Sequence, residues 1–498
     1  MRQCVTVATR MSNRLGPGEA ETATVVAQIG LGVLSGWLSA SRLRQVLAQC
    51  GRMHRRGRKL PAPLVVWLLV AAAMFRAVGL GRVLRMIGAG AVRVPAGTGA
   101  ISQARTRIGA QPLALLAEQV LGPIAGPGTP GAFYAGMRVL ALDGTGAAVP
   151  DTSANQDAFG RPGPKAAFPM PRLMVLAEAG TLGIFAGAHG AWKTSEQDLA
   201  LATLDSAAPK LGVDTLILAD RGLGNTTTIL ACRKVGAHAL MRVRTGANAA
   251  KYPVEKLLND GSWLSTSRIG ARHRRALGGQ LPQGPHTVRL IDFTVIITSP
   301  AGRTRREHFR LVTTLIDPHR WPAAELAALY IQRWCAETTI GLLKIDFLLD
   351  KNQLMRSKTP EGIDQELYAA LVAYHLIRQL VHSVATEHGL DPDRISHAGA
   401  LTEARINLIT HPDPDQAYQL ACLILAAASQ RNPHRPDRAH RRQVRQPTRA
   451  WPDLIPHQPD ENGRYRYELH IDWPELGHPP SRDPTVTNHS TLTSRNLN

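Results

Sequence analysis

The sequence predicts a mixed α/β fold, and the pattern of its middle third supports that prediction. Short apolar segments typical of strands occupy 138–142, 215–219 and 239–244, and the first two end directly at an aspartate. Apolar residues at helical spacing occupy 197–207 and 226–235, in the intervals between these strands. Strands that alternate with helices along a chain are typical of a mixed α/β sheet.

The region before these strands is predicted to be helical. Apolar residues recur at helical spacing through 25–122, and the Gly/Pro-rich segment 122–133 marks a boundary. The most apolar segment, 60–75, begins with two prolines within four residues and is short for a membrane span. We interpret it as a buried helix, with a single membrane anchor as the alternative.

The rest of the chain is predicted to begin with strands and to continue with helices. Strand character extends over 246–316, and helix signals appear at Pro322 and at Thr359–Pro360, before the apolar segment 366–381. After residue 430, proline, arginine and histidine dominate without periodicity. That composition is typical of a disordered tail.

The chain is strongly basic, which bears on its partners. It has 58 Lys and Arg residues against 38 Asp and Glu, for a formal charge of +20. A protein this basic usually contacts a polyanion, most often nucleic acid, although a basic protein without such a partner is the alternative. The five cysteines are scattered and form no Cys-x-x-Cys pair, which argues against a zinc site or a disulfide framework.

The segment YIQRWCAETTIGLLK, residues 330–344, carries one acid between two bases on an apolar background. A continuous helix, at about 100° per residue, would place Tyr330, Arg333, Glu337 and Lys344 on one stripe about 60° wide. A solvent-exposed helix face with an Arg–Glu pair at i, i+4 would have the same pattern. The functional interpretation therefore depends on other acids that converge on Glu337.

Two such acids follow predicted strands. Asp143 in LALDGT and Asp220 in LADRG stand at strand ends, where the ligand crevices of α/β sheets form. Each aspartate alone would also suit an ordinary turn. Together with Glu337 they are hard oxygen ligands suited to Mg²⁺. Two such ions can activate the attacking oxygen in phosphodiester cleavage and stabilise the leaving one.

These residues resemble the catalytic motif of the DDE transposases of the bacterial insertion sequence 4 family. The family signature Tyr-x2-Arg-x3-Glu-x6-Lys is matched at every spacing by Tyr330, Arg333, Glu337 and Lys344. The two family aspartates fall on Asp143 and Asp220. The resemblance covers about residues 25–385.

The resemblance implies a ribonuclease-H-like catalytic core with a β-rich insertion between the second aspartate and the glutamate. It implies two Mg²⁺ ions, for which Mn²⁺ can substitute, held by Asp143, Asp220 and Glu337. It also implies cut-and-paste chemistry on double-stranded DNA. A homodimer on paired ends would cut at the terminal inverted repeats of the element and join the 3′-hydroxyls to target DNA.

DNA contacts are expected at five further positions, which are Tyr330, Arg333, Lys344, Arg221 and Phe309. Arg333 and Lys344 would contact phosphates beside the cut, and Tyr330 would help to fix the strand. Phe309 stands, by its offset from Tyr330, where relatives have a tryptophan that stacks on a flipped base. A residue of a core strand is the equal alternative for Phe309.

The expected organisation has six parts: a helical N-terminal domain that binds DNA ends (1–130), the first part of the core (131–245), the β-rich insertion (246–311), the second part of the core with the Glu337 helix (312–385), a helical C-terminal region (386–430) and a basic, disordered tail (431–498). The alternatives are a metal-dependent nuclease without strand transfer, a catalytically idle DNA-binding protein descended from a transposase, and a membrane-associated protein. All three acids are present, which argues against the catalytically idle alternative. The expected location is the bacterial cytoplasm, at the nucleoid and without a membrane partner.

Overall fold

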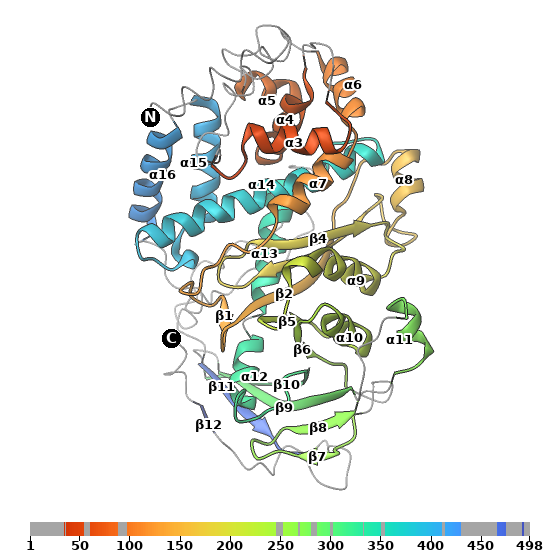
Figure 1. The fold of residues 1–498 in the computed structure, drawn as a ribbon, viewed down its shortest axis with the longest axis vertical. Helices are drawn as coiled ribbons and strands as arrows, with labels where there is room; N and C mark the ends of the chain where they lie inside the picture. The colour runs from red at the N-terminus through yellow and green to blue at the C-terminus, as the bar shows by residue number, and fades with distance from the viewer. Residues whose placement is uncertain are drawn as a thin grey trace.

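A long mixed sheet and a helical assembly at one end of it make up the protein (Figure 1). The computed structural model describes residues 34, 36–53, 60–87, 97–245, 252–266, 269–279, 286–298, 302–331, 333–349, 354–410, 414–429, 466–474 and 491–492.

The sheet has the strand order β12-β11-β9-β10-β6-β5-β2-β3-β4. Its three central strands run parallel, and the other neighbours along this order are antiparallel. The strands of this path are β2 (Met137–Gly146), β3 (Arg172–Glu178), β4 (Ile184–Gly190), β5 (Thr215–Ala219), β6 (His238–Arg242), β9 (Thr287–Thr298), β10 (Thr304–Thr313), β11 (Arg466–Asp472) and β12 (Thr491–Leu492). Three short strands pair beside it: β1 (Phe133–Tyr134), β7 (Lys256–Leu257) and β8 (Trp263–Thr266).

Helices cover both faces of the central strands, whose side chains alternate between two apolar cores. Leu140 of β2 and Ile217 of β5 lie in the core beneath α9 and α10, whereas Val139 and Leu216 lie in the core beneath α12 and α13. Burial on both faces explains the continuous apolar strand TLILA. The helices are α9 (Glu196–Ala207), α10 (Thr226–Lys234), α12 (Ala323–Ile331) and α13 (Trp334–Leu343), and α8 (Ser153–Phe159) follows β2. The predicted mixed α/β fold is confirmed.

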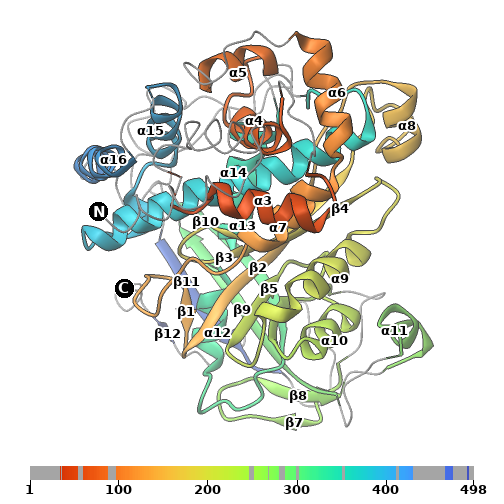
Figure 2. The same cartoon turned by 45° about the horizontal axis from the view of Figure 1, so that its top comes forward.

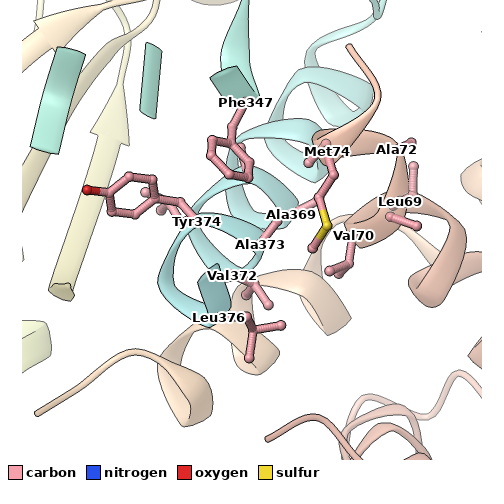
Figure 3. Packing of buried hydrophobic residues seen from close by; sticks show 14 of the residues in the cluster. Leu69, Val70, Ala72, Met74, Phe347, Ala369, Val372, Ala373, Tyr374 and Leu376 are labelled. Carbon is pink, nitrogen blue, oxygen red and sulfur yellow. The ribbon is translucent and has the colours of Figure 1, made fainter. Parts of the chain in front are cut away.

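The helical assembly packs around two apolar helices, α4 (Ala62–Met74) and α14 (Pro360–Glu387). All 13 residues of α4 are buried, which confirms the prediction of a buried helix at 60–75. Val70 and Met74 lie against Ala369 and Ala373 of α14 (Figure 3). Around them lie α3 (Ala40–Gln49), α5 (Leu80–Ile87), α6 (Thr98–Ile108), α7 (Gln111–Val120), α15 (His397–Thr410) and α16 (Pro414–Ser429), as Figure 2 also shows.

In the part of the chain that the structure describes, no helix is both long and apolar enough to cross a membrane.

A buried ionic cluster joins α14 to the turn after α4 and to α6. Glu366 Oε2 accepts a hydrogen bond from Arg76 Nη1 at 2.9 Å, and Arg105 Nη2 lies 3.8 Å from Glu366 Oε1. Arg105 also donates to Gln365 Oε1 and Ser357 Oγ, at 2.9 and 2.8 Å. Burial acts to raise the pKa of Glu366, but the charges of Arg76 and Arg105 outweigh it and the pKa is lowered. The cluster therefore depends on a charged Glu366.

The segment predicted as a β-rich insertion extends the central sheet. β10 pairs with β6, β9 pairs with β10, and β8 pairs with β9, with the short helix α11 (Ala271–Ala276) between β8 and β9. The expected boundary between residues 311 and 312 falls inside β10. Hydrogen bonding therefore continues without a break from the central strands into this segment.

The prediction of a disordered tail is wrong for residues 466–472, which form β11 on the edge of β9. Ile471 is buried in the core beneath α12, Leu469 packs beside it, and Asp472 Oδ2 accepts from Thr294 Oγ1 at 2.8 Å. The sequence RYELHID alternates polar and apolar residues, but the proline, arginine and histidine around it obscured that strand pattern. Most of the remaining tail lies outside the described residues.

We predict that Glu366→Ala lowers the free energy of unfolding by about 3–5 kcal/mol, because Arg76 and Arg105 would stay buried without their counter-charge. Chemical denaturation measures this change. A lowered carboxyl pKa stabilises the fold above the unfolded-state pKa, and this stabilisation is lost as pH falls through the folded-state pKa. The difference between the two proteins should therefore shrink in acid.

Glu361→Ala is the matched control, since Glu361 lies exposed in the first turn of the same helix. We expect it to lower stability by less than about 1 kcal/mol. Equal losses in the two variants would contradict the role assigned to the ionic cluster.

Candidate active site

The two candidate aspartates lie side by side because they stand at equivalent positions on neighbouring parallel strands. Leu142 of β2 is paired with Ala219 of β5, and Asp143 and Asp220 are the residues that follow this pair. The parallel pairing of β2 with β5 ends at this pair, at the edge where α/β sheets bind ligands. Asp143 itself lies within β2, which continues to Gly146 in its pairing with β3, and not at the strand end that the sequence predicts. The structure thus brings together two acids that are 77 residues apart in the sequence.

Backbone N–H groups hold one oxygen of each aspartate. Gly144 N–H donates to Asp143 Oδ1 at 2.8 Å, and two N–H groups of the following turn donate to Asp220 Oδ1 at 2.8 and 3.1 Å. That turn lies directly against β6, where a Cβ on Gly224 would overlap the carbonyl oxygen of Arg242. The absence of a side chain at Gly224 therefore keeps Asp220 beside β6.

Arg333 connects Glu337 to the aspartates. Its Nη2 donates to Glu337 Oε1 at 2.6 Å, and its Nη1 lies 4.0 Å from Asp143 Oδ2. Burial acts to lower the pKa of Arg333, but the neighbouring Tyr330, Glu337 and Asp143 outweigh it, so that the pKa is raised. Arg333 is therefore a permanent cation that partly neutralises Asp143 and Glu337.

The pKa of Asp143 is raised to about 6, mainly by burial. The N–H of Gly144 and the charge of Arg333 oppose the rise, whereas the carboxylates of Asp220 and Glu337 add to it. Carboxylates that raise one another's pKa are the groups that a divalent cation stabilises in their charged form. Because all three donors are oxygens, the residues fit a hard ion such as Mg²⁺.

The three carboxylates are near one another but do not converge fully. Among the described residues, the ligand atoms of three metal-binding side chains lie within 4.8 Å of one another only at Glu387, His388 and Cys422. The Glu337 side chain is 59% exposed, against 21% for Asp143, and is bound to Arg333. Binding of one ion by all three acids therefore requires side chains to move, and the exposed Glu337 has room to do so.

The expected continuous helix over 330–344 is interrupted. α12 ends at Ile331, α13 begins at Trp334, and Lys344 begins a short π-helical turn, Lys344–Leu348. At the junction, Arg333 N–H donates to the Tyr330 carbonyl at 3.0 Å, an i to i−3 bond in place of the α-helical i to i−4 bond. The helix breaks because α12 packs on β6, β9 and β11, whereas α13 packs on β2 and β3.

Tyr330 and Phe309 belong to a packed aromatic group. Tyr330 is only 4% exposed, and burial raises its pKa to about 12. The Phe309 ring stacks on Phe293 at 5.0 Å and meets the Tyr330 ring edge-on at 6.5 Å. The Arg242 guanidinium lies 4.1 Å from the centre of the Phe309 ring. Because β10 runs between β9 and β6, Phe293 and Arg242 flank this ring from its two sides.

Arg242 is a site residue that sequence reasoning missed. It ends β6 next to the turn after Asp220, and its charge acts on the ionisation of Tyr330. Its only sequence signal is a basic residue within the segment ALMRVR, which is too common to single out.

The other two expected DNA contacts lie at the margins of the site. Arg221 is exposed in the turn after Asp220. Lys344 follows Glu337 by seven residues, about two helical turns, and so lies on the same side of α13. The structure thus gathers Asp143, Asp220, Glu337, Arg333 and Tyr330 closely and places the other residues around them.

Comparisons with known proteins agree with this geometry. A model of the insertion element 4 transposase N-terminal region matches residues 28–118, and a model of the transposase DDE domain matches residues 134–376. The chain is 27% identical over 378 residues to "Transposase InsG for insertion sequence element IS4" of Escherichia coli (strain K12), covering 73% of this chain and 79% of that protein.

Among solved structures, the chain is similar to a piggyBac transposase in a synaptic complex with hairpin DNA. The match has a TM-score of 0.40 and 10% sequence identity, and it covers 86% of this chain and 87% of the other. A likeness of this size carries no argument about fold or function. The assignment depends instead on the two family models and on the sequence relative, which cover both the helical region and the region that holds Asp143, Asp220 and Glu337. The chain belongs to the insertion sequence 4 family of DDE transposases.

Proposed function

We propose that this transposase cuts the ends of its insertion sequence and joins the freed 3′-hydroxyls to target DNA, with Asp143, Asp220 and Glu337 as its catalytic acids. The observation that carries the proposal is the pair of aspartates on neighbouring parallel strands, with Glu337 connected to them through Arg333. The strand order β4-β3-β2-β5-β6 supports a ribonuclease-H-like core.

The same three acids would hold the metal, for which we propose two Mg²⁺ ions with Mn²⁺ as a substitute. Such ions, when bound, polarise the phosphate and stabilise the attacking and leaving oxygens. The chain supplies the positioning. Backbone N–H groups fix one oxygen of Asp143 and one of Asp220, and the exposed Glu337 could turn toward them by leaving its hydrogen bond with Arg333.

Arg333 and Lys344 would hold the DNA strand beside the cut, whereas Tyr330, which is buried, could touch the strand only after a local rearrangement. The planar guanidinium of Arg333 can bind a phosphate through two parallel hydrogen bonds. The buried Tyr330 ring packs at the junction that positions Arg333, and Lys344 and Arg221 add positive charge nearby. A flipped base can stack on Phe309 only if Arg242 leaves the ring, so this role for Phe309 requires a local rearrangement.

The proposed partners are double-stranded DNA, at the terminal inverted repeats and at the target, and a second copy of the chain in a homodimer on paired ends. The charge of +20 supports contact with DNA, and residues 1–130 and 431–498 would supply much of the electrostatic affinity. The proposed place of action is the nucleoid in the bacterial cytoplasm.

Glu337→Gln is expected to abolish cleavage and joining while leaving end binding nearly unchanged, because the amide keeps the shape of the side chain but loses its charge. A Mg²⁺-dependent nicking and strand-transfer assay on element-end DNA measures the chemistry, and a gel shift in EDTA measures binding. Glu325→Gln, at an exposed acid of α12, is the control and should cut normally.

Cutting by Glu337→Gln at nearly the wild-type rate would reject the assignment of this acid. Cleavage without joining by the wild-type chain would favour a nuclease without strand transfer.

We expect slower single-turnover cleavage from each of the variants Arg333→Lys and Lys344→Ala. The initial DNA affinity should change little, because many other basic residues contribute to it. Lysine keeps the charge of Arg333 but loses its planar fork. If the two residues only stabilise the exposed face of the helix, each i, i+4 side-chain pair contributes about 0.2–0.5 kcal/mol to stability. Cleavage would then stay normal in both variants. Melting temperature and cleavage rate, measured on the same variants, separate these outcomes.

Metal affinity is expected to fall in mild acid, because the pKa of Asp143 is raised to about 6 and a bound ion must displace its proton. Mn²⁺ affinity, measured by calorimetry on the whole chain, should fall about tenfold per pH unit below pH 6 and change little above it. Asp143→Asn should bind weakly without this pH dependence. Constant wild-type affinity between pH 7 and 5 would contradict the assignment.

A further inference from the structure

A positively charged cavity lies in the helical assembly, apart from the catalytic acids. It has a volume of about 570 Å³ and is bounded by the turn after α4, the start of α5 and the start of α6. In both overall views α14 lies between these helices and the sheet (Figures 1 and 2). None of the described residues that line it is acidic, and five are arginines: Arg76, Arg82, Arg85, Arg105 and Arg356.

Arg76 is the buried donor of this cavity. It is 8% exposed, and its Nη1 is held by Glu366 at 2.9 Å. Its Nε and Nη2 have no hydrogen-bond partner among the residues that the structure describes. Leaving charged N–H groups buried and unpaired is unfavourable, so this edge of the guanidinium is suited to an acceptor that enters the cavity.

The free edge of Arg76 is the one that binds an anion through two parallel bonds. Arg310 in the same protein uses this edge on a carboxylate, with Nε 2.7 Å from Asp292 Oδ1 and Nη2 2.6 Å from Asp292 Oδ2. A phosphate presents a similar pair of oxygens to a guanidinium. The chemistry of the cavity therefore matches a phosphate group.

The surroundings of Arg76 add positive charge toward the surface. Arg82 and Arg85 are exposed on α5, whose first turn contains no acidic residue and lines the cavity. The N–H groups of Arg82 and Val83 donate to the Gly79 carbonyl at 2.9 and 3.0 Å, so the attraction for an anion comes from the arginine charges rather than from this turn. Arg105 and Arg356 have structural partners, Gln365 and the Phe75 carbonyl among them, and contribute charge from fixed positions.

We propose that this cavity is a phosphate-binding site and that the DNA backbone supplies the phosphate. The choice of DNA rests on the proposed function, whereas the cavity itself requires only a phosphate. Duplex DNA suits the site because the exposed Arg82 and Arg85 continue the positive charge from the cavity to the surface. The site would hold DNA at the helical assembly, in addition to the contacts beside the cut.

The double variant Arg82→Ala/Arg85→Ala tests the proposal without disturbing the buried cluster, since alanine is a strong helix former. Binding of element-end duplex is measured by fluorescence anisotropy in EDTA, so that no cleavage is needed. We expect Kd to rise roughly fivefold for each lost phosphate contact near 0.15 M salt, and the slope of log K against log salt to fall by about 0.9 per contact.

The matched control is Arg272→Ala/Arg275→Ala on α11, which removes two exposed charges elsewhere. Its Kd should rise less than twofold. If DNA affinity falls equally in both double variants, the loss is due to overall charge and the proposal is overturned. Unchanged affinity in Arg82→Ala/Arg85→Ala would also overturn it.

A second measurement examines the cavity independently of DNA. Pyrophosphate should raise the melting temperature of the wild-type chain, and this shift should be smaller in Arg76→Lys, which keeps the charge but loses the fork. The pyrophosphate-induced shift in melting temperature could depend on Arg76 while the DNA affinity of Arg82→Ala/Arg85→Ala stays unchanged. This combination would show that the phosphate comes from a free compound and not from DNA, which would overturn that part of the proposal. Wild-type protein that binds no DNA but shows the pyrophosphate shift would reject the proposed function and leave the phosphate site standing.

Discussion

The parallel pairing of β2 with β5 is the constraint on which the candidate active site depends. It places Asp143 and Asp220 at the same level of one sheet edge, where their like charges disfavour each other. The surrounding groups are arranged to hold this negative charge: backbone N–H groups bind one oxygen of each aspartate, and Arg333 approaches from the facing helix. The pKa of Asp143 is raised because burial outweighs these contacts. Such a cluster is suited to a divalent cation.

The break between α12 and α13 is a second consequence of packing on this sheet. α12 covers the strands on one side of β5 and α13 covers β2 and β3, so one straight helix cannot serve both surfaces. The junction between them carries Arg333, which reaches Glu337 on the next turn and approaches Asp143 on the sheet. The position of this arginine thus results from the interruption of the helix.

Helix α14 connects the site to the helical assembly. Phe347, in the turn that continues α13, packs edge-on against Tyr374 of α14 at 5.6 Å, and the Tyr374 hydroxyl donates to the Leu182 carbonyl beside β4 at 3.0 Å (Figure 3). Further toward its start, α14 carries Glu366, which binds Arg76 at the edge of the positively charged cavity. A single buried helix therefore joins the layer that carries the candidate acids to the proposed phosphate site, so that DNA bound at both would be held in a defined orientation.

The sequence by itself determined most of the helices and strands and singled out the three acids as candidate ligands, because both follow from local patterns. Short apolar segments placed Asp220 directly after β5 and Asp143 in β2, and helical spacing placed Lys344 two turns beyond Glu337. Only the tertiary structure decided what depends on contacts between distant segments. It interrupted the helix at Arg333, flanked Phe309 with Arg242 and Phe293, added 466–472 to the sheet, and left one edge of Arg76 unpaired in a cavity. Local periodicity carries no information on such contacts, since packing partners are chosen by the shape and charge of the whole fold.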